Sequence, residues 1–401
     1  MQSGKNLKPY AKKIPIVALL IESSRASGRA LLDGIARFAQ HYGHWSFYWE
    51  PGGLEKAWPK LKALNVDGII LRDVDKLDEV KRLDIPAVVI GHSKSEIPNF
   101  VNVVTDSAAI GKIGAEHLLS CGFKHFAYCG YGSLTSSSIK PKMLVWSELR
   151  RASFQKSIEK AGFKVDTHCT LSAAAHAWPD ELNKITSWLE LLPKPVGLMA
   201  CNDDCGRQVI EACKLAELLV PDEVGVLAAD NDELVCGLSN PPMSSVAINF
   251  ERAGYEAALV LNDLLRGKTK APVNISVAAT HVVVRSSTDF VAITDRNLGK
   301  ALQFIRDHLR ENIMVSDIAR TAGLSRRSLE MKFRREMKFS IHRYIRRMRT
   351  EQIVRLLMET ELPVGEIAES LGFSDVQHFA RYFRAGKGLS PLAFRRTHGK
   401  R

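Results

Sequence analysis

The sequence predicts two fold classes in one chain, an α/β part with parallel, doubly wound sheets followed by a smaller all-α part. Two observations lead to this division. Short apolar segments alternate with amphipathic ones over the first 290 residues. Residues 291–401 instead contain a repeat, in which a pair of short helical segments occurs twice. The charge divides at the same place, because the first part holds 33 Lys and Arg against 32 Asp and Glu, and the second part 23 against 12.

The strands of the α/β part are predicted by short, mostly apolar segments rich in residues that favour strands. These segments are residues 13–21, 45–50, 66–71, 85–91, 125–130, 196–201 and 224–229. Amphipathic stretches between them predict helices at 29–42, 107–120 and 151–161. Strands that are apolar on both faces and alternate with helices are typical of parallel sheets covered by helices on both sides.

Polar residues follow several predicted strands, at the carboxyl ends beyond which such sheets bind ligands. They are Ser23-Ser24-Arg25, Arg72-Asp73, His92, Asn202-Asp203 and Asp230-Asn231. Taken singly, Asn and Asp after a strand are common turn formers and helix caps. Taken together, Arg, Asn and Asp offer paired donors and acceptors for adjacent sugar hydroxyls, and Trp178 offers an aromatic face for a sugar ring.

The duplicated unit of the last part reads as a short helix, a glycine turn and a second helix. An apolar stripe at i, i+3, i+4 and i+7 begins at Val315 and again at Val364. In Gly323-Leu324-Ser325 and Gly372-Phe373-Ser374, glycine suits the left-handed end of one helix and serine is expected to cap the next. The residues of the second helices that are predicted to face inward are Leu329, Phe333, Phe379 and Phe383.

The outer face of each second helix is polar and mostly basic. It carries Arg326, Arg327, Glu330, Met331, Arg334 and Arg335 in the first copy, and Val376, Gln377, His378, Arg381 and Arg384 in the second. This is the pattern of a helix-turn-helix motif, whose second helix enters a DNA major groove. Arg and Gln can reach base edges, while flanking Arg residues meet phosphates. The alternative interpretation is that the two units are helical hairpins with a purely structural role. The basic charge of this part of the chain favours DNA binding over that alternative.

The two motifs, at about 315–336 and 364–385, are joined by residues 341–359, whose spacing predicts one helix of about 28 Å. Such a helix would hold the two recognition helices about one DNA turn apart, roughly 34 Å. The duplication therefore predicts a polypeptide that reads two successive major grooves on one face of double-stranded DNA.

Residues 366–396 resemble the second half of an AraC-type DNA-binding domain. The matching residues are Gly372-Phe373, Phe379, Phe383, Gly388, Ser390-Pro391 and Phe394-Arg395. The resemblance implies that base contacts fall on Arg327, Glu330 and Met331 of the first recognition helix and on Val376, Gln377 and Arg381 of the second. Met331 and Val376 depart from the polar residues usual there, and they would meet thymine methyl groups or make no contact.

Residues 103–130, 200–232 and 239–265 resemble the sensor domain of lactose-repressor-type regulators, which have the two-lobed fold of type I periplasmic binding proteins, and 282–289 resemble its closing strand. The resemblance implies a tail at 1–13, a sugar-binding sensor at 14–290 and a DNA-binding domain at 291–401. It divides the sensor into lobe 1, about 14–122 plus 247–268, and lobe 2, about 123–246 plus 272–290.

The same resemblance implies that a ligand in the cleft between the lobes contacts Arg150, Asn202 and Asp230, with Asp203 beside them and Trp178 near the aromatic residue of the family. Cys205 stands where Ala is usual, and we expect this change to be neutral.

The order of sensor before reader resembles the xylose-operon regulator group. Residues 22–51 are similar to the opening of that group and add Ser24, Arg25 and Arg29 as ligand candidates. The resemblance implies a cytoplasmic homodimeric activator whose partners are an operator, a pentose such as D-xylose, and RNA polymerase. The residues themselves identify neither the sugar nor a choice between activation and repression.

The sequence predicts no cofactor, metal or catalytic residue. Cys201 and Cys205, like His41 and His44, are too isolated to form a zinc site, and we expect free thiols in a reducing cytoplasm. No apolar run reaches the roughly 18 residues of a membrane helix, and we read no signal peptide. Nucleotide-binding and hydrolase motifs are missing, since "GYGS" at 130–133 lacks a third glycine. Two alternatives remain: a DNA-tethered enzyme that processes a sugar or nucleotide, and a DNA-binding module whose cleft binds no small molecule.

Overall fold

The computed structural model describes residues 14–42, 44–52, 60–61, 63–72, 77–91, 97, 100–133, 142–171, 178–268, 274–289, 295–311, 313–337 and 340–398. The predicted tail, Asp73 and His92 lie outside these ranges. The chain divides into two compact units. The first comprises the chain up to Val104, apart from Ser93–Ser95, together with Ala253–Ile275; the second comprises Thr105–Arg252 and the chain from Ser276 onward.

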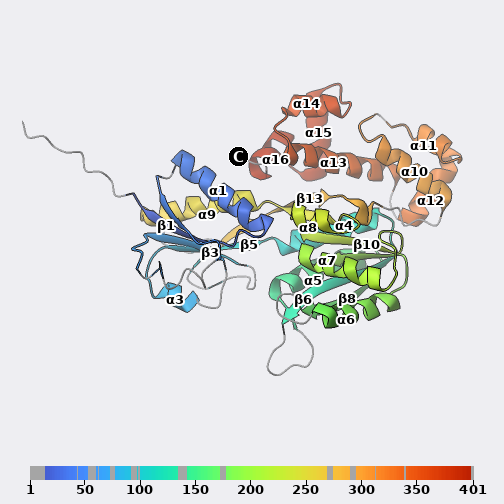
Figure 1. Ribbon diagram of the computed structural model, residues 1–401. Coiled ribbons are helices and arrows are strands. Elements are labelled where there is room, and N and C mark those ends of the chain that lie inside the picture. Colours follow the sequence, from blue (N-terminus) through green and yellow to red (C-terminus); the bar gives the residue numbers. More distant parts are fainter. Residues whose placement is uncertain are drawn as a thin grey trace, which may run out of the picture. The chain divides into compact units, whose positions relative to one another are not determined.

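The first unit contains a six-stranded sheet in the order β12-β5-β4-β3-β1-β2. Its strands are β12 (Asn274–Val277), β5 (Val101–Thr105), β4 (Ala87–Ile90), β3 (Gly68–Arg72), β1 (Ile16–Leu20) and β2 (Ser46–Trp49). The strands from β5 to β2 pair in parallel. Figure 1 shows α1 (Ala26–Tyr42) and α9 (Phe250–Leu265) on one face of this sheet and α3 (Leu77–Lys81) on the other. Phe38 of α1 meets Tyr255 of α9 edge to face, with ring centroids 5.5 Å apart.

The second unit contains a seven-stranded sheet in the order β13-β11-β10-β9-β6-β7, with β8 also paired to β6. Its strands are β13 (Ala279–Val283), β11 (Ser244–Ile248), β10 (Val224–Asp230), β9 (Val196–Ala200), β6 (His125–Ser133), β7 (Lys142–Met143) and β8 (Val165–Leu171). β13 and β7 are antiparallel to their neighbours, and the others are parallel.

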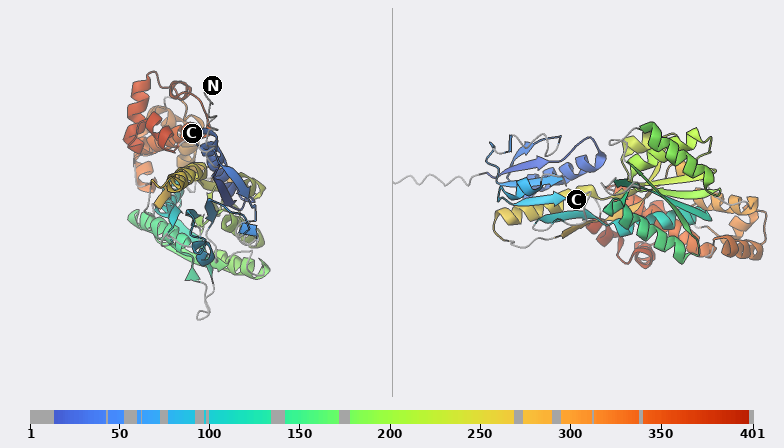
Figure 2. Two further views of the ribbon diagram at one scale, coloured as in Figure 1. Left: turned by 90° about the vertical axis from the view of Figure 1, so that its left-hand side faces the viewer. Right: turned by 90° about the horizontal axis from the view of Figure 1, so that it is seen from below.

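Helices cover both faces of this second sheet (Figure 2). On one face α4 (Ser107–Ser120) packs on α5 (Val145–Lys160), and on the other α6 (Trp178–Leu191) packs on α7 (Asp203–Leu215), followed in the chain by α8 (Glu233–Leu238). Because helices lie on both sides, every residue of β9 and of Val224–Ala229 is buried. The predicted strands all overlap observed ones, and the predicted doubly wound α/β class is confirmed.

Two details differ from the expectations. The closing strand expected at 282–289 ends at Val283, and Ser286–Thr288 form a short 3₁₀ helix. The Ser287 hydroxyl donates to the Val226 carbonyl at 2.6 Å and accepts from the Ser244 N–H at 2.9 Å, which holds this turn against the sheet. The N-terminal segment of the first unit ends at Val104, whereas lobe 1 is expected to reach about residue 122, because α4 packs on α5 and belongs to the second unit.

The all-α part is built around one long helix, α13 (Ile341–Glu359), which matches the predicted bounds. The helices before it are α10 (Arg296–Asp307), α11 (Val315–Thr321) and α12 (Arg326–Met337); those after it are α14 (Val364–Ser370), α15 (Val376–Lys387) and α16 (Pro391–His398). Figure 1 shows the two groups at opposite ends of α13. Each group has its own apolar core, and α13 contributes Ile341 and Tyr344 to the first and Ile353, Val354 and Leu357 to the second.

Candidate functional site

The two predicted helix-turn-helix units are present as α11–α12 and α14–α15. Their turn glycines, Gly323 and Gly372, have φ angles of 64° and 71°, the left-handed conformation that a side chain would strain. In the first copy the Ser325 hydroxyl accepts from the Ser328 N–H at 3.2 Å, as predicted. The expected cap of the second copy, Ser374, was wrong.

Asp375, one residue later, caps α15. Its carboxylate accepts from the backbone N–H groups of Gln377 at 2.9 Å and His378 at 3.0 Å. A carboxylate has two oxygens for two of the unpaired N–H groups at the start of a helix, whereas a hydroxyl has one. These hydrogen bonds lower the pKa of Asp375.

The division into inner and outer faces is confirmed. Leu329, Phe333, Phe379 and Phe383 are fully buried. Every residue predicted to contact DNA is exposed, and these residues are Arg326, Arg327, Glu330, Met331, Arg334, Arg335, Val376, Gln377, His378, Arg381 and Arg384. Met331 is 60% exposed and Val376 is 48% exposed, so two apolar side chains face water on surfaces that otherwise are polar. Contact with DNA itself stays a prediction.

Two of these arginines are held by carboxylates. Arg326 Nε lies 2.9 Å from Glu330, and Arg335 Nε lies 3.0 Å from Glu336. Exposed ion pairs of this kind contribute at most about 1 kcal/mol. Both guanidinium groups can therefore exchange these partners for phosphates at little cost.

A stack of arginine and aromatic side chains fixes α15 against α13. The Arg349 guanidinium lies 4.7 Å from the Phe373 ring centroid, and that of Arg346 lies 5.3 Å from the Tyr382 ring. Arg349 also donates to the Leu371 carbonyl at 2.5 Å. The sequence does not predict these contacts, because the pattern within one helix does not reveal which side chains meet between two helices.

Replacing Arg349 with methionine is expected to lower the stability of this part by about 1–3 kcal/mol, since it removes a charged donor to a buried carbonyl and a cation–π contact. The measurement is urea unfolding followed by circular dichroism. Arg343→Met is the matched control, because Arg343 is exposed on the same helix. Equal unfolding of the two variants would show that the stack does not hold α15.

The candidate ligand residues of the second unit meet at the carboxyl edge of its sheet. Arg150 of α5 is 1% exposed, and its Nη2 lies 3.3 Å from Asp230 Oδ1 at the end of β10. Its other terminal nitrogen donates to the Cys201 carbonyl, and its guanidinium lies 4.9 Å from the Trp146 ring centroid. Asp230 has a φ angle of 104°, a strained conformation that is common at functional sites.

Asn202 and Asp203 begin α7 beside this pair. The Asn202 side-chain oxygen accepts from the Cys205 N–H at 3.0 Å and caps the helix, so its amide NH₂ is the candidate donor to a ligand. Asp203 is buried and accepts from the Ser245 hydroxyl at 2.5 Å and from the Asp232 N–H at 2.6 Å. Burial, and then the nearby Asp230 carboxylate, raise the pKa of Asp203 well above its usual range.

Trp178 is the first residue of α6 and is partly buried. The Arg207 guanidinium lies 4.9 Å from its ring centroid. Arg207 thus covers part of the ring, and the predicted contact between Trp178 and a sugar stays a prediction.

The other candidates, Ser24, Arg25 and Arg29, lie in the first unit at the start of α1. Arg29 Nη1 donates to the carbonyls of Ser23 and Ser24, both at 2.9 Å, and the Ser24 hydroxyl donates to Glu22. Arg25 is exposed. Arg29 therefore organises the loop after β1, and a ligand contact by these residues stays a prediction.

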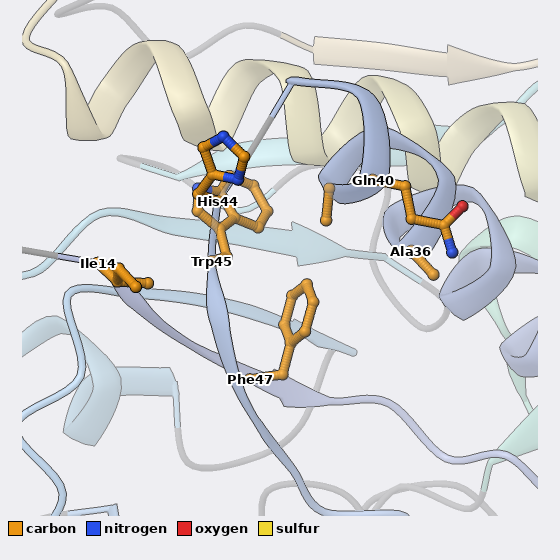
Figure 3. A pocket seen from close by; sticks show the side chains of 7 residues that line it. Ile14, Ala36, Gln40, His44, Trp45 and Phe47 are labelled. Atoms are coloured by element: carbon orange, nitrogen blue, oxygen red, sulfur yellow. The ribbon is translucent and has the colours of Figure 1, made fainter.

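An apolar pocket of about 410 Å³ lies elsewhere in the first unit (Figure 3). Its lining residues are Ile14, Ala36, Ala39, Gln40, His44, Trp45 and Phe47. Ile14 and Trp45 precede β1 and β2, so the pocket lies at the amino ends of these strands. Ligands of parallel sheets bind at the opposite edge, and five of the seven lining side chains are apolar.

Other kinds of site receive no support in the described ranges. Among these residues no group of three or more His, Cys, Asp or Glu is placed to hold a metal ion. Cys121, Cys129, Cys201, Cys205, Cys213 and Cys236 are buried free thiols. Burial raises the pKa of Cys213 to about 12, which keeps it protonated and unreactive. The helices that the structure describes include none with the length and apolar character needed to span a membrane.

Comparisons with known proteins match both parts of the chain. Residues 115–288 match a family described as a periplasmic binding protein-like domain, and residues 318–397 match a helix-turn-helix domain. The chain is 29% identical to the xylose operon regulatory protein of Haemophilus influenzae, over 94% of this chain and 97% of that protein. It is 28% identical to the xylose operon regulatory protein of Escherichia coli K12, over 94% of this chain and 96% of that protein.

Two solved structures show the same folds. A xylose-binding transcription activator is 27% identical, with a TM-score of 0.59 over 96% of this chain and 98% of that one. A transcriptional regulator solved in complex with cellobiose is 20% identical to this chain, with a TM-score of 0.55 over 68% of this chain and 84% of that one. This similarity shows only the fold of the α/β part.

Proposed function

We propose that this chain, a homologue of the xylose operon regulatory proteins, is a DNA-binding transcription regulator. A small sugar controls its activity in this proposal. The observation that carries this proposal is the pair of helix-turn-helix units with exposed, basic recognition helices on the same chain as a sugar-sensor fold. The sequence predictions of a sensor followed by an AraC-type reader are confirmed by relatives that match over 94% of the chain.

The sugar, in this proposal, binds at the carboxyl edge of the second sheet and is a pentose such as D-xylose, the ligand named for a relative. Arg150 is buried and held on two sides, so its donors point in fixed directions. Asp230 accepts hydrogen bonds from a sugar hydroxyl beside them. A site built from such paired groups rejects ligands that lack the matching hydroxyls.

The sugar controls DNA binding by shifting an existing equilibrium. A ligand that prefers one state roughly a hundredfold shifts the balance by about 2.7 kcal/mol. This is enough to move a modest bias between DNA-competent and incompetent arrangements, while phosphate contacts supply most of the affinity. We further propose that the chain acts as a homodimeric activator on paired operator half-sites, with RNA polymerase as its partner, in the cytoplasm.

Isothermal titration of the full chain with pentoses and hexoses tests this function. Heat of binding without conversion of the sugar supports a sensor. Conversion would favour a DNA-tethered enzyme. If none of the sugars gives heat of binding, the result would favour a DNA-binding module whose cleft binds no small molecule.

A further inference from the structure

Tyr131 lies in the same row of the second sheet as the two candidate ligand residues Asn202 and Asp230. Cys129 of β6 is in register with Ala200 of β9, so the position opposite Tyr131 is residue 202. In the same way Met199 is in register with Leu227 of β10, which sets residue 202 opposite Asp230. The Cys201 N–H donates to the Cys129 carbonyl at 2.8 Å and continues the pairing beyond the last residue of β9.

This row has the dimensions of a sugar site. Neighbouring strands are about 4.8 Å apart, so the three positions span roughly 10 Å. That is the width of one monosaccharide with its hydroxyl groups in contact with side chains on either side. A ligand held by Asn202 and Asp230 therefore lies within reach of the strand that carries Tyr131.

The Tyr131 hydroxyl is buried and lacks a partner in the described part of the chain. The residue is 5% exposed, and its hydroxyl oxygen makes no hydrogen bond to the described residues. Tyr128, on the same strand and fully buried, instead donates to the Ser147 carbonyl at 2.8 Å. Buried hydroxyls are nearly always paired, and leaving one unpaired is costly. Tyr131 is therefore an exception among the described residues, and a bound ligand would supply the missing partner.

A second buried donor at this edge also lacks a partner. Arg150 Nε makes no hydrogen bond within the described ranges, although both terminal nitrogens of the same guanidinium are bonded. Burial raises the pKa of Tyr131, so its hydroxyl keeps the proton and remains a donor. Each of these donors suits a ligand rich in oxygen acceptors, such as a polyol.

We propose that the Tyr131 hydroxyl donates a hydrogen bond to one hydroxyl of the bound sugar and thereby selects among sugars by the position of that group. The proposal rests on the sugar-sensing function above and adds a residue that the family resemblance does not supply. A trapped water is the competing partner for the Tyr131 hydroxyl, and the experiment distinguishes it from a sugar.

The test compares wild type, Tyr131→Phe and the control Tyr128→Phe in the full chain. We measure the affinity for D-xylose and its monodeoxy analogues by calorimetry, and the melting temperature without sugar. Tyr131→Phe is expected to raise the melting temperature, because it removes an unpaired buried hydroxyl, and to weaken D-xylose binding about tenfold, the value of one hydrogen bond. Tyr128→Phe is expected to lower the melting temperature and leave the affinity unchanged.

The deoxy analogues identify the partner. One analogue should bind wild type and Tyr131→Phe equally, because it lacks the hydroxyl that Tyr131 contacts. If wild type binds D-xylose and Tyr131→Phe binds it as well as wild type does, Tyr131 holds water only and the inference is overturned, while the sensor function stands. If wild type binds none of the sugars, the sensor function and the inference fail together.

Discussion

Substituting Arg150 with methionine is expected to weaken binding of the effector sugar at least a hundredfold and to destabilise the second unit by up to about 3 kcal/mol. The two losses have different causes. Arg150 supplies the buried donors of the proposed site, and it also neutralises Asp230, whose carboxylate oxygen lies 3.3 Å from Nη2. Without the guanidinium, a half-buried carboxylate remains with a weaker set of partners.

The double variant Arg150→Met with Asp230→Asn separates these causes. Removing both charges leaves no uncompensated carboxylate, so we expect most of the stability to return. Sugar binding should stay lost, because neither paired group is available. The measurements are urea unfolding and sugar calorimetry on the two single variants and the double variant. A double variant that binds the sugar like wild type would show that the effector site lies elsewhere.

DNA binding provides an internal control for these variants. Arg150 lies in the α/β part, far along the chain from the recognition helices, and both helix-turn-helix units have cores of their own. In the absence of sugar, Arg150→Met should therefore retard duplex DNA as wild type does. Loss of DNA binding as well would indicate a folding defect instead of a lost sugar contact.

Local patterns were enough to predict the two helix-turn-helix units and the helix that joins them. In each unit the helical period of the apolar residues, the turn glycine and the inward-facing apolar pair lie close together in the sequence. The joining helix α13 also begins and ends where its spacing predicts. The one error in a cap arose because Ser374 and Asp375 are adjacent and both are good caps. Their order of preference depends on backbone angles that the sequence does not reveal.

The candidate sugar site was predicted less completely. Asn202 and Asp230 were predicted from their position after apolar strands and from a family resemblance, and Arg150 from the resemblance alone. The structure brings Arg150 and Asp230 together across 80 residues of sequence. Tyr131 carried no signal of its own, because a tyrosine near the end of an apolar strand is an ordinary core residue. Its interest comes from strand register and from a missing hydrogen-bond partner, which are both properties of the folded sheet.

Replacing Arg381 with alanine is expected to relax the sequence preference of DNA binding, by about 1–3 kcal/mol at one base position. Arg381 is exposed on α15, two residues from the buried Phe379 and Phe383 on either side. The fold should therefore be unaffected, with a stability change within about 0.5 kcal/mol. The preferred operator is first obtained by selection with the wild-type chain from random duplexes.

Arg384→Ala is the matched control, since Arg384 is exposed on the same helix three residues further on. As a phosphate contact it carries no sequence information, so its removal should weaken binding to all duplexes alike and reduce the slope of log K against log salt by about one. Arg381→Ala should instead weaken binding to the selected operator and leave binding to unrelated duplexes nearly unchanged at fixed salt. If operator preference survives in Arg381→Ala, α15 does not read bases through this residue, and the assignment of the second recognition helix has to be abandoned.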